Sequence, residues 1–170
     1  MKYINGTRTC YLTLGIDDVK VIKWYVDISY GVHPDLRSHT GRIMTMGTGA
    51  LQSGSTKQKI STRSGTEAEL VDDVISKILQ TKLFIEEQGY EIEKNILFQD
   101  NKETNGRKSA GKRSRHINIR YFFVTDQVRL GNMEIRHCPT DNMIGDYMTK
   151  PSQGEKVREF RRMILGMEGD

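Results

Sequence analysis

The sequence has only two cysteines and three prolines in 170 residues, and it contains no long apolar run. Cys10 and Cys138 are too few for a disulfide framework, which excludes a small secreted domain held together by disulfides. No apolar run approaches the roughly 20 residues needed to span a bilayer, and the first residues lack a basic-then-apolar signal pattern. We therefore expect a soluble, intracellular protein.

Charge of both signs, in contrast, is abundant. Lys and Arg number 26 against 22 Asp and Glu, which gives a net charge of +4. The basic residues gather near residues 57–63 and 107–120; such clusters are often only solvated surface, but they also suit a polyanionic partner. The candidate contacts to such a partner are Lys57, Lys59, Arg63, Arg113, Arg115, His116 and Arg120.

Three strands are expected in the first third of the chain. Residues 21–28 are rich in β-branched and aromatic side chains, which is typical of a strand. Residues 42–51 carry glycines at 47 and 49 and predict two more strands joined by a sharp bend. The first three strands should therefore be antiparallel.

Helical periodicity begins after this hairpin. Apolar residues on one helical face predict a long helix over residues 66–87, ended by Gly89. The remaining expected elements are strands at 95–99 and 133–138, helices at 114–130 and 155–165, and loops at 102–112 and 139–145. This order predicts an α/β domain with a mixed five-stranded sheet, three antiparallel strands followed by parallel strands, flanked by helices.

Acidic residues stand at the junctions of this pattern. Asp27 interrupts the first strand, and Glu67 and Glu69 open the long helix. Asp100 ends the fourth strand, and Asp146 begins the segment after the fifth. Asp27 at a strand end facing water is the simpler interpretation, but strand ends and helix starts can converge at one edge of such a sheet. Carboxylates brought together there would repel one another unless a divalent cation such as Mg²⁺ bound to their oxygens.

Five motifs, YVDIS, SGTEAELVDDV, LFQDN, KRSRHINIRYFFVTD and CPTDNMIGDYMTKP, carry a resemblance that covers nearly the whole chain. In this order they resemble the ribonuclease H domain at the end of the polymerase polyprotein of copia-type (Pseudoviridae) long-terminal-repeat retrotransposons. Residues 1–20 resemble the tail of the preceding reverse transcriptase and connection region, and residues 21–170 the ribonuclease H domain. The resemblance implies a ribonuclease H-like fold and an endonuclease that hydrolyses the RNA strand of RNA/DNA hybrids during reverse transcription.

The same resemblance implies two Mg²⁺ ions, for which Mn²⁺ is expected to substitute. Their implied ligands are Asp27, a Glu of the TEAE motif, Asp100 and Asp146. The motif position favours Glu69, but at about 100° per residue Glu67 lies on the side of the apolar stripe and Glu69 faces away. We therefore expect Glu67 as the ligand and keep Glu69 as the alternative.

The resemblance also implies partners. These are the RNA/DNA hybrid, contacted by Asn101 of the QDN motif and by the basic residues named above, and the adjacent reverse transcriptase domain of the same polyprotein. His137 resembles the mobile histidine that assists product release in some ribonucleases H, although its place on a predicted strand favours a structural role. A cytoplasmic virus-like particle is the implied location, and no membrane partner is expected.

Two functions of different class remain open at this stage. The first is the active metal-dependent nuclease. The second is a degenerate module that binds hybrid without cutting it, because two segments flanking the site, after TEAEL and after QDN, are shorter than in the family pattern. Retention of all four acidic positions favours the enzyme. An integrase or transposase would need only three acids, the last on a helix, and does not match these motifs.

Overall fold

The protein is described here by a computed structural model. It covers residue 5 and residues 7–29, 37–58, 74–100, 115–150 and 154–167, without the side chains of residues 115–121. Within these residues no helix is both long and apolar enough to cross a membrane.

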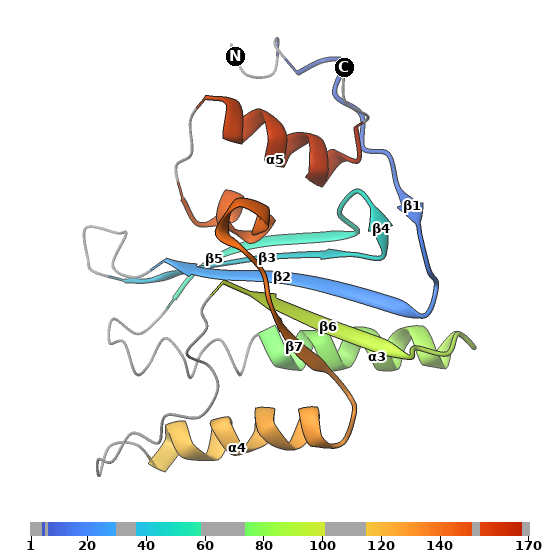
Figure 1. Ribbon diagram of the computed structural model, residues 1–170, viewed down its shortest axis with the longest axis vertical. Helices are drawn as coiled ribbons and strands as arrows, with labels where there is room; N and C mark the ends of the chain where they lie inside the picture. Colours follow the sequence, from blue (N-terminus) through green and yellow to red (C-terminus); the bar gives the residue numbers. More distant parts are fainter. Residues whose placement is uncertain are drawn as a thin grey trace.

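A mixed five-stranded sheet forms the centre of the molecule (Figure 1). Its strand order is β5-β3-β2-β6-β7, in which β5, β3 and β2 are antiparallel and β2, β6 and β7 are parallel. The bounds are β2 (Val21–Ser29), β3 (His39–Thr45), β5 (Gln52–Lys57), β6 (Lys94–Gln99) and β7 (Glu134–His137). The α/β class and the predicted change from antiparallel to parallel strands are thus confirmed.

Helices cover both faces of this sheet. Figure 1 shows α3 (Ser76–Glu87) and α4 (Arg115–Arg129) on one side and α5 (Glu155–Leu165) on the other. The predicted bounds of the last helix are reproduced, and those of the preceding one differ by a single residue at each end. The first predicted helix is confirmed from a π-helical turn at Val74 and Ile75 onward, and its earlier part lies outside the described residues.

Side chains of β2 point alternately to the two faces of the sheet and contribute to two separate apolar cores. Ile22, Trp24 and Val26 are buried on the side of α3, where they join a cluster that includes Val74 and Ile78. Tyr25 points to the opposite side and packs with the second cluster, which is built around a fully buried Phe160 of α5. Because successive strand residues face opposite sides, Asp27 shares the face of Tyr25. The strand therefore directs this carboxylate away from the larger apolar core.

The bend predicted at glycines 47 and 49 is present, but the returning strand begins later than expected. Residues 47–48 form the short strand β4 (Gly47–Thr48), and β5 starts only at Gln52, beyond the predicted limit at residue 51. The short strand β4 pairs with β1 (Gly15–Ile16). Because residues 47–48 pair with β1, the bend is not a simple hairpin between β3 and β5. This contact produces no local periodic pattern, so the sequence did not predict it.

Several backbone hydrogen bonds attach the first residues to the rest of the molecule. Besides the β1–β4 pairing, the Thr13 N–H donates a 2.8 Å hydrogen bond to the Leu165 carbonyl oxygen at the end of α5. The division of the chain at residue 20 stays a prediction.

The segment between β7 and α5 contains two 3₁₀ helices within its described residues. They are η4 (Thr140–Asn142) and η5 (Ile144–Met148). The sequence predicted a loop through Gly145 with Asp146 opening the next element, whereas Asp146 is the third residue of η5. A 3₁₀ helix of five residues makes fewer than two turns, so its apolar residues cannot repeat often enough to mark it in the sequence, which explains the misplaced boundary.

Candidate metal centre

Two neighbouring parallel strands position the first two carboxylates. Tyr25 of β2 lies opposite Phe98 of β6, and their rings stack with centroids 4.8 Å apart. Two residues further along each strand direction stand Asp27 and Asp100. Because side chains two residues apart share a face, the strand register that stacks the rings also brings these two carboxylates together.

The third carboxylate comes from η5, which approaches the sheet closely because two glycines face each other. A Cβ on Gly41 of β3 would lie only 2.6 Å from the Gly145 carbonyl oxygen, and a Cβ on Gly145 would lie 3.0 Å from the Asp27 backbone nitrogen. Ser55 of β5 also donates a 2.6 Å hydrogen bond to the Met148 carbonyl oxygen. The two side-chain-free positions thus let η5 rest on β2 and β3.

This arrangement brings one carboxylate oxygen each from Asp27, Asp100 and Asp146 within 4.8 Å of one another. Oxygens bound to one Mg²⁺ at about 2.0–2.1 Å can lie at most about 4.2 Å apart, so a small side-chain rotation would close these three around a cation. The residue Asp146 is buried, and no donor among the described residues reaches its Oδ1 atom. An all-oxygen donor set with a buried, unpartnered carboxylate oxygen fits a hard divalent cation.

Asp27 is 4% exposed and is surrounded by donors. Thr149 donates a short hydrogen bond to Asp27 Oδ2, and the Ser29 hydroxyl donates to the same atom at 3.4 Å. The ammonium nitrogen of Lys150 lies 3.6 Å from this oxygen and 2.9 Å from Asp146 Oδ2. These hydrogen bonds and the ion pair therefore hold the Asp27 carboxylate in a fixed orientation.

The charges of the cluster act on one another. Burial raises the pKa of Asp146, the hydrogen bond from Lys150 opposes this rise, and the negative charges of Asp27 and Asp100 add to it. Burial lowers the pKa of Lys150, but its hydrogen bond to Asp146 and the nearby acidic charges outweigh this effect and raise it overall. The pKa of the Cys138 thiol is raised by burial and by Asp100 and Asp146. A net negative field at the site therefore favours cations.

The other predicted site residues are distributed as follows. Glu67, Glu69, Lys59, Arg63, Asn101 and Arg113 lie outside the described residues. Arg115, His116 and Arg120 belong to α4, whose first seven side chains are likewise outside the description. Lys57 is exposed at the end of β5, and His137 is exposed at the end of β7.

Two contacts to the acidic cluster were not anticipated from the sequence. Thr149 and Lys150 follow Asp146 at spacings of three and four residues, and the backbone N–H groups of both donate to the Asp146 carbonyl oxygen at 3.1 and 3.0 Å. Residues at these spacings lie on one side of a helical turn. The signal was therefore present in DYMTK, but it becomes readable only if Asp146 lies within a helical turn.

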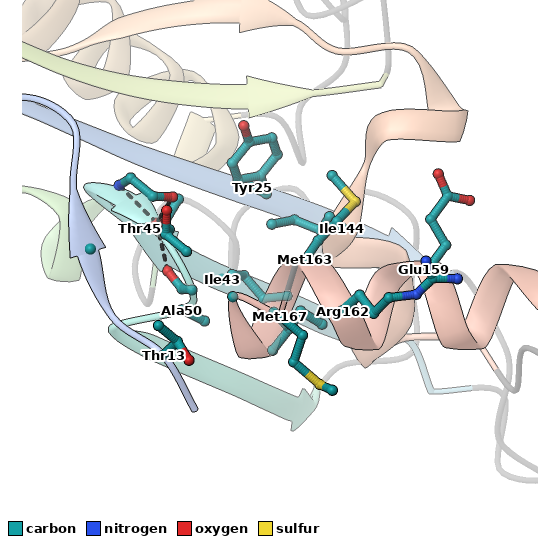
Figure 2. Close-up of a pocket in the computed structure, with 16 residues that line it drawn as sticks. Thr13, Tyr25, Ile43, Thr45, Ala50, Ile144, Glu159, Arg162, Met163 and Met167 are labelled. Atoms are coloured by element: carbon teal, nitrogen blue, oxygen red, sulfur yellow. Dashed lines mark hydrogen bonds between the residues drawn. The ribbon is translucent and has the colours of Figure 1, made fainter. Parts of the chain in front are cut away.

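A separate cavity of about 1020 Å³ lies between the β1–β4 pair and α5 (Figure 2). Tyr25, Ile43, Ile144 and backbone from the two short strands contribute to its wall. The described residues that line it include one acid and one base, Glu159 and Arg162, and none of the three clustered aspartates. Figure 2 shows these two side chains extending from α5. The cavity therefore does not share the carboxylate chemistry of the cluster.

Comparison with known sequences relates the chain to transposon proteins. It is 25% identical over 176 residues to the retrovirus-related Pol polyprotein from transposon TNT 1-94 of Nicotiana tabacum, an alignment that covers 100% of this chain and 13% of the relative. It is 26% identical over 171 residues to the retrovirus-related Pol polyproteins from transposons RE2 and RE1 of Arabidopsis thaliana, covering 96% of this chain and 12% of each relative. The chain thus spans about an eighth of the length of these polyproteins. No protein-family model matches the sequence.

Comparison with solved structures finds ribonucleases H. RNase H1 from the archaeon Halobacterium salinarum matches with a TM-score of 0.45 and 11% identity, over 70% of this chain and 86% of that one. The N-terminal RNase H domain of a Mycobacterium tuberculosis protein, solved as a fusion with maltose-binding protein, matches with a TM-score of 0.47 and 10% identity, over 81% and 96%. The recognition of a retrotransposon Pol polyprotein, made from the motifs, is confirmed: the sequence relatives of this chain are retrovirus-related Pol polyproteins from transposons.

Proposed function

We propose that this chain is the ribonuclease H domain of a retrotransposon Pol polyprotein and that it hydrolyses the RNA strand of RNA/DNA hybrids in a metal-dependent reaction. The observation that carries the proposal is the meeting of Asp27, Asp100 and Asp146 within 4.8 Å. The similarity to Pol polyproteins supports the biological setting, because reverse transcription produces RNA/DNA hybrids. The ribonuclease H domain is assigned to residues 21–170, within a virus-like particle in the cytoplasm.

Asp27, Asp100 and Asp146 would hold two Mg²⁺ ions, which Mn²⁺ would replace. Bound Mg²⁺ supplies a coordinated water of lowered pKa and neutralises charge that develops on the phosphodiester. Thr149 fixes the Asp27 carboxylate through its hydroxyl donor, and η5 fixes Asp146 relative to β2. The protein's contribution is therefore a preorganised set of oxygen ligands. The stereochemistry of cleavage follows from how the bound hybrid is oriented relative to these ligands.

The fourth carboxylate is assigned to Glu67, with Glu69 as the alternative. Both precede the buried stripe that begins at Val74 and continues through Ile78, and this stripe sets the rotation of the helix. Comparing Glu67→Gln with Glu69→Gln for hybrid cleavage at saturating Mg²⁺ distinguishes them. Loss of cleavage in the Glu69 variant alone would show that the helix starts late or bulges.

Binding of the hybrid is assigned mainly to phosphate contacts. Lys57 is exposed on the edge strand β5, and the remaining candidates are Lys59, Arg63, Asn101, Arg113, Arg115, His116 and Arg120. Release of counterions from phosphates makes such binding strongly dependent on salt. We expect affinity for the hybrid to fall steeply between about 50 and about 200 mM salt. A flat response would contradict this assignment.

The decisive experiment uses a labelled RNA/DNA hybrid with Mg²⁺, with and without a chelator. Asp27→Asn should abolish cleavage while the metal-free variant melts at the same temperature as the wild type or higher, because one of three repelling charges is removed. Asp141→Asn is the matched control, since it makes the same charge change at a side chain that is 96% exposed. Its cleavage rate should equal that of the wild type.

Two results would contradict the nuclease assignment. Cleavage near the wild-type rate in Asp27→Asn would show that the reaction does not depend on the aspartate cluster. Tight binding of hybrid by a wild-type chain that never cleaves it would instead support the degenerate binding module.

A further inference from the structure

Lys150 occupies an unusual place in the acidic cluster. Its ammonium nitrogen lies 2.9 Å from Asp146 Oδ2 and 3.6 Å from Asp27 Oδ2. The two carboxylates are almost fully buried, with side-chain exposures of 6% and 4%, whereas the lysine side chain is 42% exposed. The lysine therefore reaches from solvent into a buried site and ends between two of its carboxylates.

The backbone fixes the direction of this approach. The Lys150 N–H donates a 3.0 Å hydrogen bond to the Asp146 carbonyl oxygen, so the two residues are one helical turn apart. Side chains at this spacing lie on the same side of the turn. The ammonium contacts Oδ2 of Asp146, while Oδ1 of the same carboxylate has no donor among the described residues. One oxygen is thus paired with the protein's own cation and the other stays available.

Charge balance gives this contact a function in the metal-free protein. Three carboxylate oxygens within 4.8 Å repel one another, and two of the residues are too buried for water to screen them fully. A single ammonium between Asp27 and Asp146 offsets part of that repulsion. A divalent cation bound by the same oxygens would compete with the ammonium for them, and two cations at such a short distance repel each other.

We propose that Lys150 is an internal counter-ion that holds the acidic cluster together before metal binds, and that metal binding displaces its ammonium toward solvent. The inference rests on the proposed metal site. The long flexible side chain of Lys150 and its partial exposure allow the ammonium to leave without movement of η5. The lysine then stabilises the metal-free state and weakens metal binding at the same time.

This combination separates the proposal from an ordinary structural role. A lysine that only supported the fold would, when removed, lower both stability and metal affinity. A displaced counter-ion, when removed, lowers the stability of the metal-free domain but raises its affinity for metal.

The test compares Lys150→Met with the wild-type chain in two measurements, the melting temperature in chelator and the affinity for Mn²⁺ by titration followed with electron paramagnetic resonance. Lys150→Met should melt at a lower temperature in chelator and bind Mn²⁺ about tenfold more tightly. Lys156→Met is the matched control, because Lys156 is 39% exposed and its ammonium pairs at 3.3 Å with Asp141, outside the cluster. The control should leave Mn²⁺ affinity unchanged.

A second measurement uses the unmodified chain, so that it does not depend on how Lys150→Met folds. Acetylation of lysines by an activated ester, read by mass spectrometry, should label Lys150 severalfold faster with Mn²⁺ than with chelator, because the displaced amine is no longer paired with Asp27 and Asp146. Labelling of Lys156 should not change between the two conditions.

The outcomes distinguish the two proposals. If the wild type binds Mn²⁺ and Lys150→Met binds it with equal or lower affinity, the counter-ion proposal is wrong and the metal site remains supported. The same conclusion follows if the rate of Lys150 labelling does not change with Mn²⁺. Absence of Mn²⁺ binding in both the wild type and Lys150→Met overturns the metal site and the counter-ion together. Binding only in Lys150→Met supports a counter-ion that blocks the site.

Discussion

Replacing Gly41 by alanine tests how the site is assembled. A Cβ at this position would lie 2.6 Å from the Gly145 carbonyl oxygen, 2.7 Å from Met148 Cβ and 2.8 Å from Thr149 Cγ2. All three atoms belong to η5 or the residue that follows it, and none is the far end of a flexible side chain. The clash can be relieved only if η5 moves away from β3.

The size of this movement follows from the contact distances. The Cβ–oxygen separation must grow from 2.6 Å to the 3.4 Å of an ordinary contact, so η5 must shift by about 0.8 Å. Overpacking of this kind costs about 1–3 kcal/mol. For a chain of this size each kcal/mol lowers the melting temperature by about 2–4 °C, which gives a decrease of about 2–12 °C. A shift approaching 1 Å in a catalytic group can also reduce the rate about 10²-fold.

The assay measures melting in chelator and hybrid cleavage with Mg²⁺ for Gly41→Ala beside a control, Gly54→Ala. Gly54 is on the neighbouring strand, and the three atoms nearest to its added Cβ, at 2.7–2.9 Å, belong to the guanidinium end of Arg42, which can rotate away. The control should melt and cleave like the wild type. If Gly41→Ala also matched the wild type in both measurements, the close approach of η5 to β3 would not position Asp146, and the reasoning would be refuted.

Three further predictions concern the same face of the sheet. The pKa of Asp146 is raised in the folded state, so just above the ordinary carboxyl pKa the native state binds more protons than the unfolded state. The stability of the metal-free domain, measured by urea unfolding, should therefore fall as the pH rises from about 4 to about 7. Asp146→Asn should abolish this fall. Thr149→Val removes the hydroxyl donor to Asp27 and should lower the free energy of unfolding by about 1.5–3 kcal/mol, whereas Thr149→Ser should restore most of it; equal stability of the valine and serine variants would count against the hydrogen bond. Phe160→Ala empties the centre of the second core and should cost about 3–5 kcal/mol, against at most about 0.5 kcal/mol for the exposed Met163→Ala.

Much of the fold could be predicted from the sequence because its long elements have clear periods. Residues 155–165 and 114–130 were predicted as helices, and α5 and α4 occupy these ranges to within a residue at each end. The strand containing Asp27 was equally clear, since β-branched and aromatic residues mark it. Such signals are local, and tertiary contacts did not override them.

The short elements were harder for a physical reason. The position of η5 is decided by Gly41 and Gly145, which lie far apart in the sequence and meet only after folding. The strand predicted from residue 42 did not include Gly41, although a glycine within a strand marks close approach of another backbone. The contact of Lys150 with the acids was missed for the same reason, because it depends on Asp146 lying inside a helical turn.

The stacked pair of Tyr25 and Phe98 has a consequence for how accurately the three carboxylates are placed. Asp27 lies in β2 and Asp100 directly follows β6, and the separation of about 4.8 Å between such neighbouring strands is a constant of hydrogen-bonded sheets that is insensitive to side-chain changes. The position of Asp146 is not fixed by a strand spacing, since η5 is held by surface contacts on β2 and β3. Of the three clustered carboxylates, two thus have a fixed separation and the third is adjustable, and substitutions that alter the geometry of the cluster while preserving the fold should be concentrated where η5 meets the sheet.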